Sequence, residues 1–367
     1  MRIFGLAISA LLLASPLAAQ APARETLDIY FVDTEGGQAT LFVAPSGESV
    51  LVDTGNPGSR DAERILATLR EAGVERIDHL LITHYHGDHH GGLTELARRI
   101  PIAHFVDHGP TVETNAQGLA FQEVYRQLTA AARRTVVKPG DRLAIPGLDW
   151  QIVSAAGAVL SSPRPGAGQA NAGCPSERPA ANPADENGQS TGSFVTFGEF
   201  STIDLGDLLI PQELDLVCPV NRLGTVDLYI TSHHGQATSG SAALVHALRP
   251  RVTVMNNGTR KGGSVQAFEI LHRSPGMEDL WQLHWSHNAG VELNAPGIFI
   301  ANIDEPAALA AVIAPAGATG QGGPAAGGRP APHDGLAYSI RVSARRDGSF
   351  TVTNGRNGFS REYPPAR

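Results

Sequence analysis

Residues suited to metal chemistry are concentrated in one short stretch, LLITHYHGDHHGG (80–92), where four histidines and an aspartate fall within seven residues. His84 and His86 are two positions apart, so both side chains point to one side of an extended segment. Asp88 and His89 follow after a glycine, where the sequence becomes compatible with a helix. Catalytic zinc sites combine imidazole and carboxylate ligands and leave one position open for water. The pattern therefore predicts a metal centre where a strand ends and a helix begins, rather than histidines that line a loop by chance.

The elements that must position this centre alternate between strands and helices. Apolar and period-two runs predict strands at 27–33, 39–44, 48–55, 77–83 and 102–108, and amphipathic runs predict helices at 59–73 and 93–99. The plan recurs with strands within 193–207 and at 226–232 and 251–257, and with helices at 241–249 and near 264–273. Such a repeated plan predicts an α/β fold of four layers, in which two sheets pack face to face with helices outside.

The first residues have the three-part pattern of a secretory signal peptide. Arg2 is followed by an apolar core at 3–13 and by small residues at 18–21. A membrane anchor is the alternative, but the apolar run is shorter than the roughly 20 residues that a spanning helix needs. We therefore expect residues 1–20 to be a cleaved signal peptide, the mature chain to lack a membrane span, and the protein to be periplasmic or secreted.

The composition is that of a globular enzyme with a large core. The chain has 367 residues, of which 42% are hydrophobic and 17% charged, and its net charge is −8. It has no basic run that would follow a phosphate backbone, which counts against a nucleic acid as partner and favours a small-molecule or phosphodiester substrate. No feature of the sequence indicates an oligomeric state.

Residues 21–367 are expected to form a single domain with two insertions, near 157–190 and 306–335. Both stretches are rich in proline, glycine and alanine and lack hydrophobic periodicity, so each is interpreted as a long loop or disordered insertion. The first insertion contains Cys174, and Cys218 is the second of the two cysteines. In an oxidising compartment the two thiols could pair, but their spacing neither requires nor forbids a disulfide.

The His-x-His-x-Asp-His pattern at 84–89 resembles the signature of the metallo-β-lactamase superfamily. Three later stretches resemble further elements of that family in the same order, namely LVDTG (51–55), IDLGDLL (203–209) and LYITSHHGQ (228–236). The resemblance implies an αββα sandwich with the site along one edge of the sheets. Within the family, LGDLL followed by HHG is similar to the branch that contains the metallo-β-lactamase-like domain of competence DNA-uptake proteins.

The resemblance also implies roles for single residues. The implied metal ligands are His84, His86, Asp88, His89, Asp207 and His233. Asp207 would bridge two metal ions, and Asp53 would lie beneath the metals and orient a ligand. His234 stands beside His233 and is a candidate catalytic residue together with Asp88.

The chain departs from the family pattern at two places. The branch commonly carries Gly-His-Pro where this chain has NNGTRKGGS (256–264), and the middle metal-binding histidine of the family has no obvious counterpart before Asp207. His108, at the end of the strand expected at 102–108, could substitute as a ligand. It could equally be a loop histidine that caps the following turn.

The ligand set implies a hydrolase with two zinc ions, or manganese in their place. A bound metal lowers the pKa of its water from about 16 to roughly 7 and so supplies hydroxide at neutral pH. Asp88 would orient this nucleophile and transfer its proton. Lys261 and His284 are candidate substrate-binding residues, although Lys261 could be a surface lysine and His284 an exposed neighbour of core tryptophans.

Three functions stay open at this point. The leading hypothesis is an exported metal-dependent hydrolase of a phosphodiester-type substrate, which the competence-like motifs support. The second is a lactone, ester or β-lactam hydrolase, which export and an acidic surface suit. The third is a metal-binding or ligand-binding module without catalysis. An intact set of predicted ligands argues against the third, and activity screening separates the first two.

Overall fold

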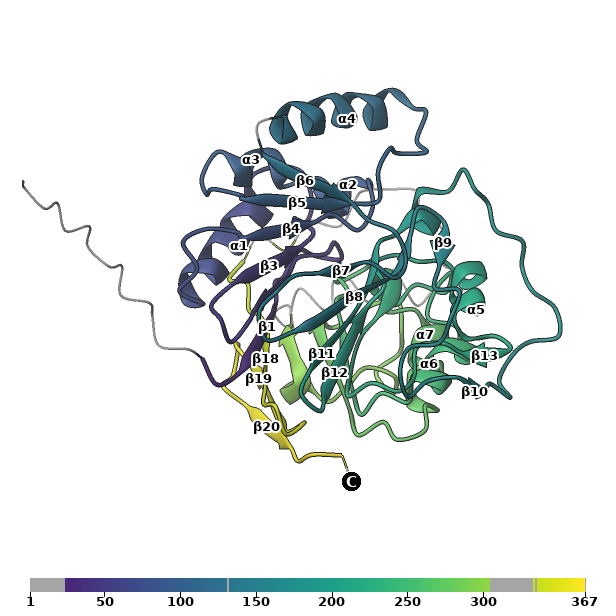
Figure 1. The fold of residues 1–367 in the computed structure, drawn as a ribbon. Coiled ribbons are helices and arrows are strands. Elements are labelled where there is room, and N and C mark those ends of the chain that lie inside the picture. Colours follow the sequence, from purple (N-terminus) through teal and green to yellow (C-terminus); the bar gives the residue numbers. More distant parts are fainter. Residues whose placement is uncertain (1–23, 131, 304–332, 334, 367) are drawn as a thin grey trace, which may run out of the picture.

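The computed structural model describes residues 24–130, 132–303, 333 and 335–366 (Figure 1). The predicted signal peptide at 1–20 and most of the second insertion lie outside these residues. Within the described ranges, no helix combines the length and the hydrophobicity that a transmembrane segment requires.

Nine strands form the first sheet, in the order β20-β19-β18-β1-β2-β3-β4-β5-β6. Their bounds are β1 Leu27–Phe31, β2 Thr40–Val43, β3 Ser49–Val52, β4 His79–Leu81, β5 His104–Asp107, β6 Arg133–Val136, β18 Ile340–Ala344, β19 Phe350–Asn354 and β20 Ser360–Tyr363. The pairs from β3 to β6 are parallel, and the pairs from β20 to β3 are antiparallel.

The second sheet has the order β17-β16-β15-β14-β12-β11-β8-β7, and β9 pairs with β8. Its strands are β7 Arg142–Leu143, β8 Asp149–Ala155, β9 Ala158–Val159, β11 Gly192–Phe197, β12 Phe200–Asp204, β14 Leu228–Ile230, β15 Val252–Met255, β16 Asp279–His284 and β17 Ile300–Asn302. Strand pairing is parallel from β12 to β17. A separate small sheet pairs β10 Gln169–Ala170 with β13 Val220–Asn221.

Helices cover the outer faces of both sheets (Figure 1). The helices on the side of the first sheet are α1 Ser59–Glu71, α2 Gly87–His90, α3 Leu93–Ala97 and α4 Ala116–Thr129. Those on the side of the second sheet are α5 Ile210–Val217, α6 Ala242–Leu248 and α7 Val265–His272. Short 3-10 turns lie at η1 Glu186–Gln189, η2 Ser232–Gly235 and η3 Gly297–Phe299.

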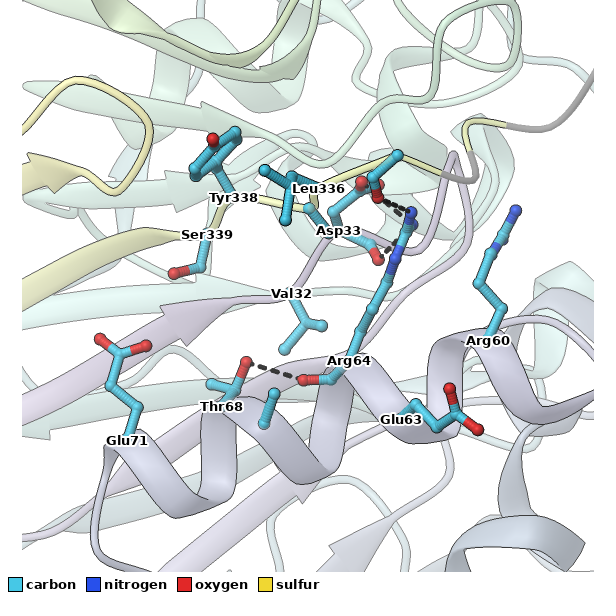
Figure 2. A pocket seen from close by; sticks show the side chains of 13 residues that line it. Val32, Asp33, Arg60, Glu63, Arg64, Thr68, Glu71, Leu336, Tyr338 and Ser339 are labelled. Atoms are coloured by element: carbon cyan, nitrogen blue, oxygen red, sulfur yellow. Dashed lines mark hydrogen bonds and ion pairs between the residues drawn. The ribbon is translucent and has the colours of Figure 1, made fainter.

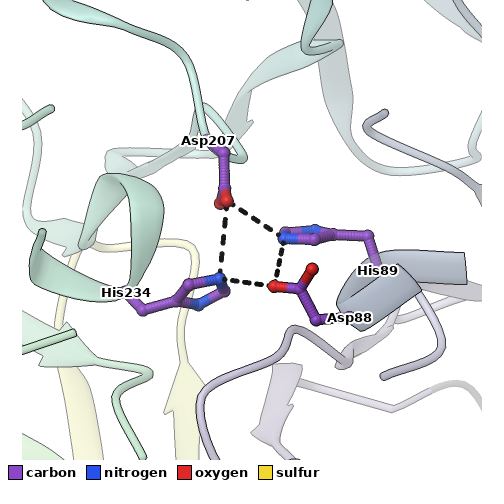
Figure 3. A group of neighbouring side chains, drawn as sticks. All are labelled: Asp88, His89, Asp207 and His234. Carbon is purple, nitrogen blue, oxygen red and sulfur yellow. Dashed lines mark ion pairs between the residues drawn. The ribbon is translucent and has the colours of Figure 1, made fainter. Parts of the chain in front are cut away.

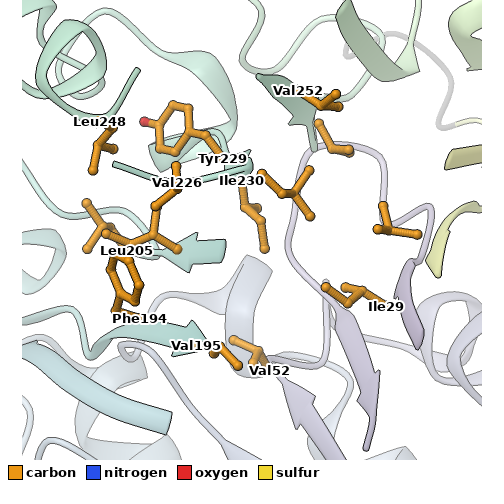
Figure 4. Packing of buried hydrophobic residues seen from close by; sticks show 14 of the residues in the cluster. Ile29, Val52, Phe194, Val195, Leu205, Val226, Tyr229, Ile230, Leu248 and Val252 are labelled. Carbon is orange, nitrogen blue, oxygen red and sulfur yellow. The ribbon is translucent and has the colours of Figure 1, made fainter. Parts of the chain in front are cut away.

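Alternating residues of the first sheet divide the core into two clusters. Ile29 and Val52 point toward the second sheet and share a cluster with Val195 and Ile230 (Figure 4). The intervening Tyr30 and Leu51 belong to the other cluster, which packs the opposite face against α1, α3 and α4. Successive side chains of a strand point to opposite faces, so the continuous apolar runs of these strands reflect a sheet that is buried on both sides. The predicted αββα sandwich is confirmed.

The first insertion is held by specific contacts. Strand β10 lies within it, and Cys174 forms a disulfide with Cys218 at the end of α5. Its last residues form η1, where Glu186 is almost completely buried. The first insertion is therefore mostly loop, and these contacts hold it in place.

The expected strands end earlier than the sequence pattern suggests, at the residues that leave the sheets to build the site. The strand expected at 48–55 ends at Val52 because Asp53 has a left-handed backbone, with φ 62°. The strand expected at 77–83 ends at Leu81, before the histidine stretch. Helix α4 at Ala116–Thr129 was not predicted from the sequence, because exposed apolar residues such as Leu119 and Val124 weaken its amphipathic pattern.

The carboxyl ends of parallel strands from both sheets lead into the same region. β3 and β4 lead into Asp53 and the histidine stretch, and β12 and β14 lead into Asp207 and η2. In open α/β sheets, ligands bind outside the carboxyl ends of the strands. This edge is therefore the candidate site.

Candidate metal centre

Four side chains converge at this edge with the spacing of a metal site (Figure 3). The Nε2 of His89 lies 3.4 Å from the Oδ2 of Asp88 and 3.2 Å from the Oδ2 of Asp207. The Nε2 of His234 lies 3.3 Å from the same Asp88 atom and 3.5 Å from the same Asp207 atom. Tetrahedral zinc with bonds of about 2.0 to 2.2 Å separates its ligand atoms by roughly 3.3 to 3.6 Å, so the four atoms fit one ion.

Two of these four atoms, the Nε2 of His89 and the Nε2 of His234, are buried without a hydrogen-bond partner. The Oδ1 of Asp207, the other oxygen of that carboxylate, is also buried and unpartnered. Buried polar atoms in folded proteins are almost always paired, and a cation coordinated by these atoms would satisfy them. The donor set therefore fits a divalent metal ion.

A second pair of nitrogens lies beside the first group. The Nε2 of His84 and the Nδ1 of His86 are 3.1 Å apart, close to the same tetrahedral spacing. The Oδ2 of Asp207 lies 3.9 Å from the Nε2 of His84. This second position thus has two imidazoles and access to Asp207, whereas the first position has four protein donors.

Asp53 contacts His89, one of the four donors, on the ring nitrogen opposite the metal position. Its Oδ1 accepts the backbone N–H of Thr83 at 2.8 Å, and its Oδ2 lies 2.6 Å from the Thr83 hydroxyl and 2.7 Å from the Nδ1 of His89. A proton on Nδ1 that is donated to this carboxylate leaves Nε2 as the lone-pair nitrogen facing Asp88 and Asp207. Asp53 is completely buried and has a positive φ, as residues held in place at functional sites often do.

Gly206 lets the segment that carries Asp207 approach the histidine stretch. Its φ is 54°, and a Cβ atom there would lie 2.9 Å from the Cβ of Thr83. The N–H of Gly206 donates to Asp204, and the N–H of Asp207 donates to the Ser190 hydroxyl at 3.3 Å. The Gly-Asp pair of IDLGDLL is thereby explained by close backbone packing.

His233 and His234 both have left-handed backbones, with φ of 52° and 56°. This conformation directs both rings to Asp207, because the Nε2 of His233 lies 3.3 Å from its Oδ2. Only His234 also contacts Asp88 and belongs to the four-donor group. The Nδ1 of His233 contacts the Thr238 hydroxyl at 3.0 Å. The geometry therefore favours His234, and not His233, as the donor beside His89.

The charges of the group are strongly coupled. Burial alone would raise the pKa of Asp207, but His89, His234 and His233 bring it well below its usual value. Burial also opposes ionisation of Asp88, whose pKa is nevertheless brought well below normal by His89, His234 and Lys261. The pKa of His84 is well below its usual value because the ring is buried and lies near His89.

Lys261 reaches the centre from the second sheet. Its Nζ forms a close ion pair with the Oδ2 of Asp88, the oxygen that belongs to the four-donor group. The lysine side chain crosses directly over Gly36, where a Cβ atom would lie 2.7 Å from the Lys261 Cβ. The lysine is therefore part of the centre and is not a detached surface residue.

His108 does not join either group of donors. Its Nε2 lies 2.9 Å from the Oε1 of Glu186, a carboxylate from the first insertion. The segment before Asp207, which lacks a histidine, supplies Ser190 and Glu186 near the centre but no nitrogen donor among the described contacts. The suggestion that His108 replaces the middle histidine is thus not supported by its position.

His284 contacts two acidic residues and does not belong to the four-donor group. Its Nε2 lies 2.6 Å from Asp33 and 3.4 Å from Glu35. On its other side, Asp33 pairs with Arg64 at 3.0 Å, where both residues border a hollow of about 520 Å³ between α1 and residues 335–339 (Figure 2). Burial opposes ionisation of Asp33, but His284 and Arg64 bring its pKa to about 2. The ligand atoms of Asp33, Glu35 and His284 all lie within 4.8 Å of one another, so these residues form a second group separate from the four donors.

Two carboxylates near the centre were not predicted from the sequence. Glu113 follows β5 and lies 3.4 Å from the Nε2 of His86, and Glu186 accepts the N–H of Tyr85 at 3.1 Å. Neither carboxylate lies within a recognisable motif. Both reach the histidine stretch only through the folding of distant segments.

Comparison with known proteins agrees with this geometry. Residues 33–166 match the family model described as the metallo-beta-lactamase superfamily. The chain contains a metallo-β-lactamase superfamily domain. The family match agrees with the donor set, which fits a divalent metal ion.

Relatives of this superfamily domain include proteins of different size. Recombination protein 2 of Haemophilus influenzae is 24% identical over 253 residues, which are 68% of this chain and 26% of that protein. An atrochrysone carboxyl ACP thioesterase of Pseudocercospora fijiensis is 39% identical over 72 residues, which are 20% of this chain and 21% of that protein. The matches therefore span about a quarter and about a fifth of the lengths of these relatives.

Among solved structures, the metallo-beta-lactamase fold protein YhfI from Bacillus subtilis is 11% identical to this chain. The superposition has a TM-score of 0.44 and covers 71% of this chain and 96% of YhfI.

Proposed function

We propose that the protein is a metallohydrolase that binds two divalent ions, zinc in preference to manganese, and cleaves a phosphodiester-type substrate. The observation that carries the choice of substrate is the ion pair between Lys261 and Asp88. A phosphodiester is anionic at neutral pH, whereas the carbonyl group of a lactone or an ester is neutral. A fixed cation beside the reaction centre therefore favours a charged substrate.

Asp88, His89, Asp207 and His234 would hold the first ion, and His84 and His86 with a share of Asp207 would hold the second. The first position offers more protein donors, so we expect it to bind metal more tightly. When bound, the metal ions lower the pKa of water and polarise the oxygen of the scissile group.

The protein side chains then have separate tasks. Asp88 stays ionised and can accept a hydrogen bond from the attacking water, which orients that water. Asp53 holds His89 so that its Nε2 faces the metal position. His233 contacts Asp207 without joining the four donors, so its ring is available for proton transfer near the reacting atoms. This assignment exchanges the roles first expected for His233 and His234.

Lys261 would change partner during the reaction. In the metal-free protein its ammonium neutralises Asp88. When Asp88 serves as a metal ligand instead, the Lys261 ammonium would hold an oxygen of the anionic substrate. His284 is removed from substrate binding in this proposal, because Asp33 and Glu35 engage its Nε2.

A carbonyl substrate is the second candidate, because one relative is named a thioesterase. Its 39% identity extends over 72 residues. A thioester or an ester would use the same metal positions, but its neutral reacting group would depend less on Lys261.

We also propose that the chain works outside the cytoplasm. The disulfide between Cys174 and Cys218 supports this location, because disulfides persist mainly in oxidising compartments. Mass determination of the secreted or periplasmic protein would test it, with removal of a segment near residue 20 as the expected result.

The test of substrate class compares three chromogenic substrates, a phosphodiester, an ester and a thioester, on the zinc-loaded protein. The variants are Lys261→Met and a control, Lys138→Met, whose lysine is exposed and pairs with Asp141. Loss of a hydrogen bond to a charged group costs about 1.5 to 3 kcal/mol, so Lys261→Met should lower kcat/KM for the phosphodiester roughly 10- to 100-fold. Turnover of only the ester or thioester, or equal activity of Lys261→Met and Lys138→Met, would contradict the proposal.

A further inference from the structure

Glu186 is a buried carboxylate whose two oxygens serve four partners. Its Oε1 accepts the backbone N–H of Tyr85 at 3.1 Å and lies 2.9 Å from the Nε2 of His108. Its Oε2 accepts the Thr111 hydroxyl at 2.8 Å and the backbone N–H of Val112 at 2.9 Å. The carboxylate thus joins the first insertion to two other segments, and its partners keep its pKa below normal although burial opposes ionisation.

The first of these segments is the histidine stretch. Tyr85 stands between His84 and His86, so its anchored N–H fixes the backbone that places both rings. The neighbouring N–H of Thr191 donates to the carbonyl oxygen of Thr83 at 2.8 Å. The end of the insertion therefore holds the start of the histidine stretch at two points.

The second segment is the loop between β5 and α4. Its anchored residues, Thr111 and Val112, directly precede Glu113, whose Oε1 lies 3.4 Å from the Nε2 of His86. This is the ring nitrogen of His86 that does not face His84. A carboxylate on the outer nitrogen of a ligating histidine fixes its tautomer and orientation. Glu186 therefore supports His86 both through Tyr85 and through Glu113.

We propose that Glu186 is the positioning residue of the metal position formed by His84 and His86. The chain has no middle histidine to complete this metal position. The first insertion then supports the position through Glu186 without supplying a metal ligand. The inference rests on the proposed function, because it requires that metal binds there. It further implies that the four-donor position does not depend on Glu186.

The experiment is a titration of the metal-free full-length protein with Co²⁺, followed by its visible absorption and by the number of ions bound. The variant Glu186→Gln keeps the size of the side chain, but its amide nitrogen cannot accept the Thr111 and Val112 donors. The control Asp227→Asn changes another buried carboxylate, which accepts the Ser201 N–H at the opposite end of β14. Glu113→Gln changes the carboxylate that contacts the Nε2 of His86 and leaves the first insertion unchanged. It therefore tests the support of His86 through Glu113 alone.

The wild type and Asp227→Asn should bind two ions in two phases. In Glu186→Gln the weaker phase should shift to roughly 10- to 100-fold higher Co²⁺ and lose its absorption, while the stronger phase stays unchanged. Glu113→Gln should shift the same phase by a smaller factor. Unchanged phases in a folded Glu186→Gln protein would overturn this inference. A wild type with a single phase, or without any bound metal, would overturn the two-ion site of the proposed function itself.

Discussion

Replacement of Asp53 by asparagine should disable His89 as a metal ligand, although it hardly changes the size of the side chain. The Oδ2 of Asp53 lies 2.7 Å from the Nδ1 of His89 and 2.6 Å from the Thr83 hydroxyl. In Asp53→Asn, the amide oxygen can still accept the backbone N–H of Thr83. The amide NH₂ group would then face the Nδ1 of His89 and the Thr83 hydroxyl. His89 would then carry its proton on Nε2, the nitrogen that faces Asp88 and Asp207.

The size of the effect follows from this change of tautomer. Loss of a partner behind a ligand lowers metal affinity about 10- to 100-fold, which corresponds to about 1.4 to 2.8 kcal/mol. Asp53→Asn should lower metal affinity by a factor at the upper end of this range. Asp53→Ala should lower metal affinity by a smaller factor, because alanine places no hydrogen-bond donor against His89. Burial raises the pKa of Asp53, whereas His89 and Thr83 lower it, so unfolding of the metal-free proteins is needed to separate a loss of stability from a loss of metal affinity.

The assay is zinc competition against a chromophoric chelator, with thermal unfolding of the metal-free proteins measured in parallel. Nitrogen-15 spectra of the histidines report the tautomer of His89 directly. Wild-type zinc affinity in Asp53→Asn, or a much greater loss in Asp53→Ala than in Asp53→Asn, would refute the reasoning.

Three further predictions concern stability and metal content. Cys174→Ser should lower the free energy of unfolding by about 4 kcal/mol, because the disulfide closes a loop of 44 residues. Urea unfolding measures this change, and an unchanged midpoint would contradict the prediction. Burial lowers the pKa of His104 from 6.5 to about 4, so the unfolded chain takes up this proton at a higher pH than the folded chain does. The free energy of unfolding should therefore fall by at most about 3 kcal/mol as the pH drops from 6.5 to about 4. In His104→Leu, the free energy of unfolding should differ less between pH 7 and pH 4.5 than in the wild type. An equal difference in both proteins would show that His104 does not cause the pH dependence. Asp207→Ala should lose most bound metal and activity, and near-normal metal content by elemental analysis would exclude Asp207 as a shared ligand.

The sequence predicted the parts of the site that depend on local pattern. His84, His86, Asp88 and His89 lie within six residues, and their spacing alone indicates that they converge. The strand alternation and the recurring plan of elements likewise predicted the layered fold, because residues on one face of a strand follow a period of two.

The remaining contacts depend on pairs that are distant in the sequence or on unusual backbone. Tyr85 and Glu186 are 101 positions apart, and Asp88 and Lys261 are 173 apart. The left-handed backbone at both His233 and His234 turns two neighbouring rings to one carboxylate, which a regular strand or helix would not do. The pattern could therefore locate this element but could not tell which histidine also reaches Asp88.

The most direct test of the central claim is the metal content of the protein purified without chelators, compared with that of His86→Ala and His234→Ala. We predict two equivalents in the wild type and one in His86→Ala, which keeps the four-donor position. In His234→Ala the tighter ion should be the one that is lost or weakened. A wild type without metal after reconstitution, or a His86→Ala protein that still binds two ions, would contradict the account.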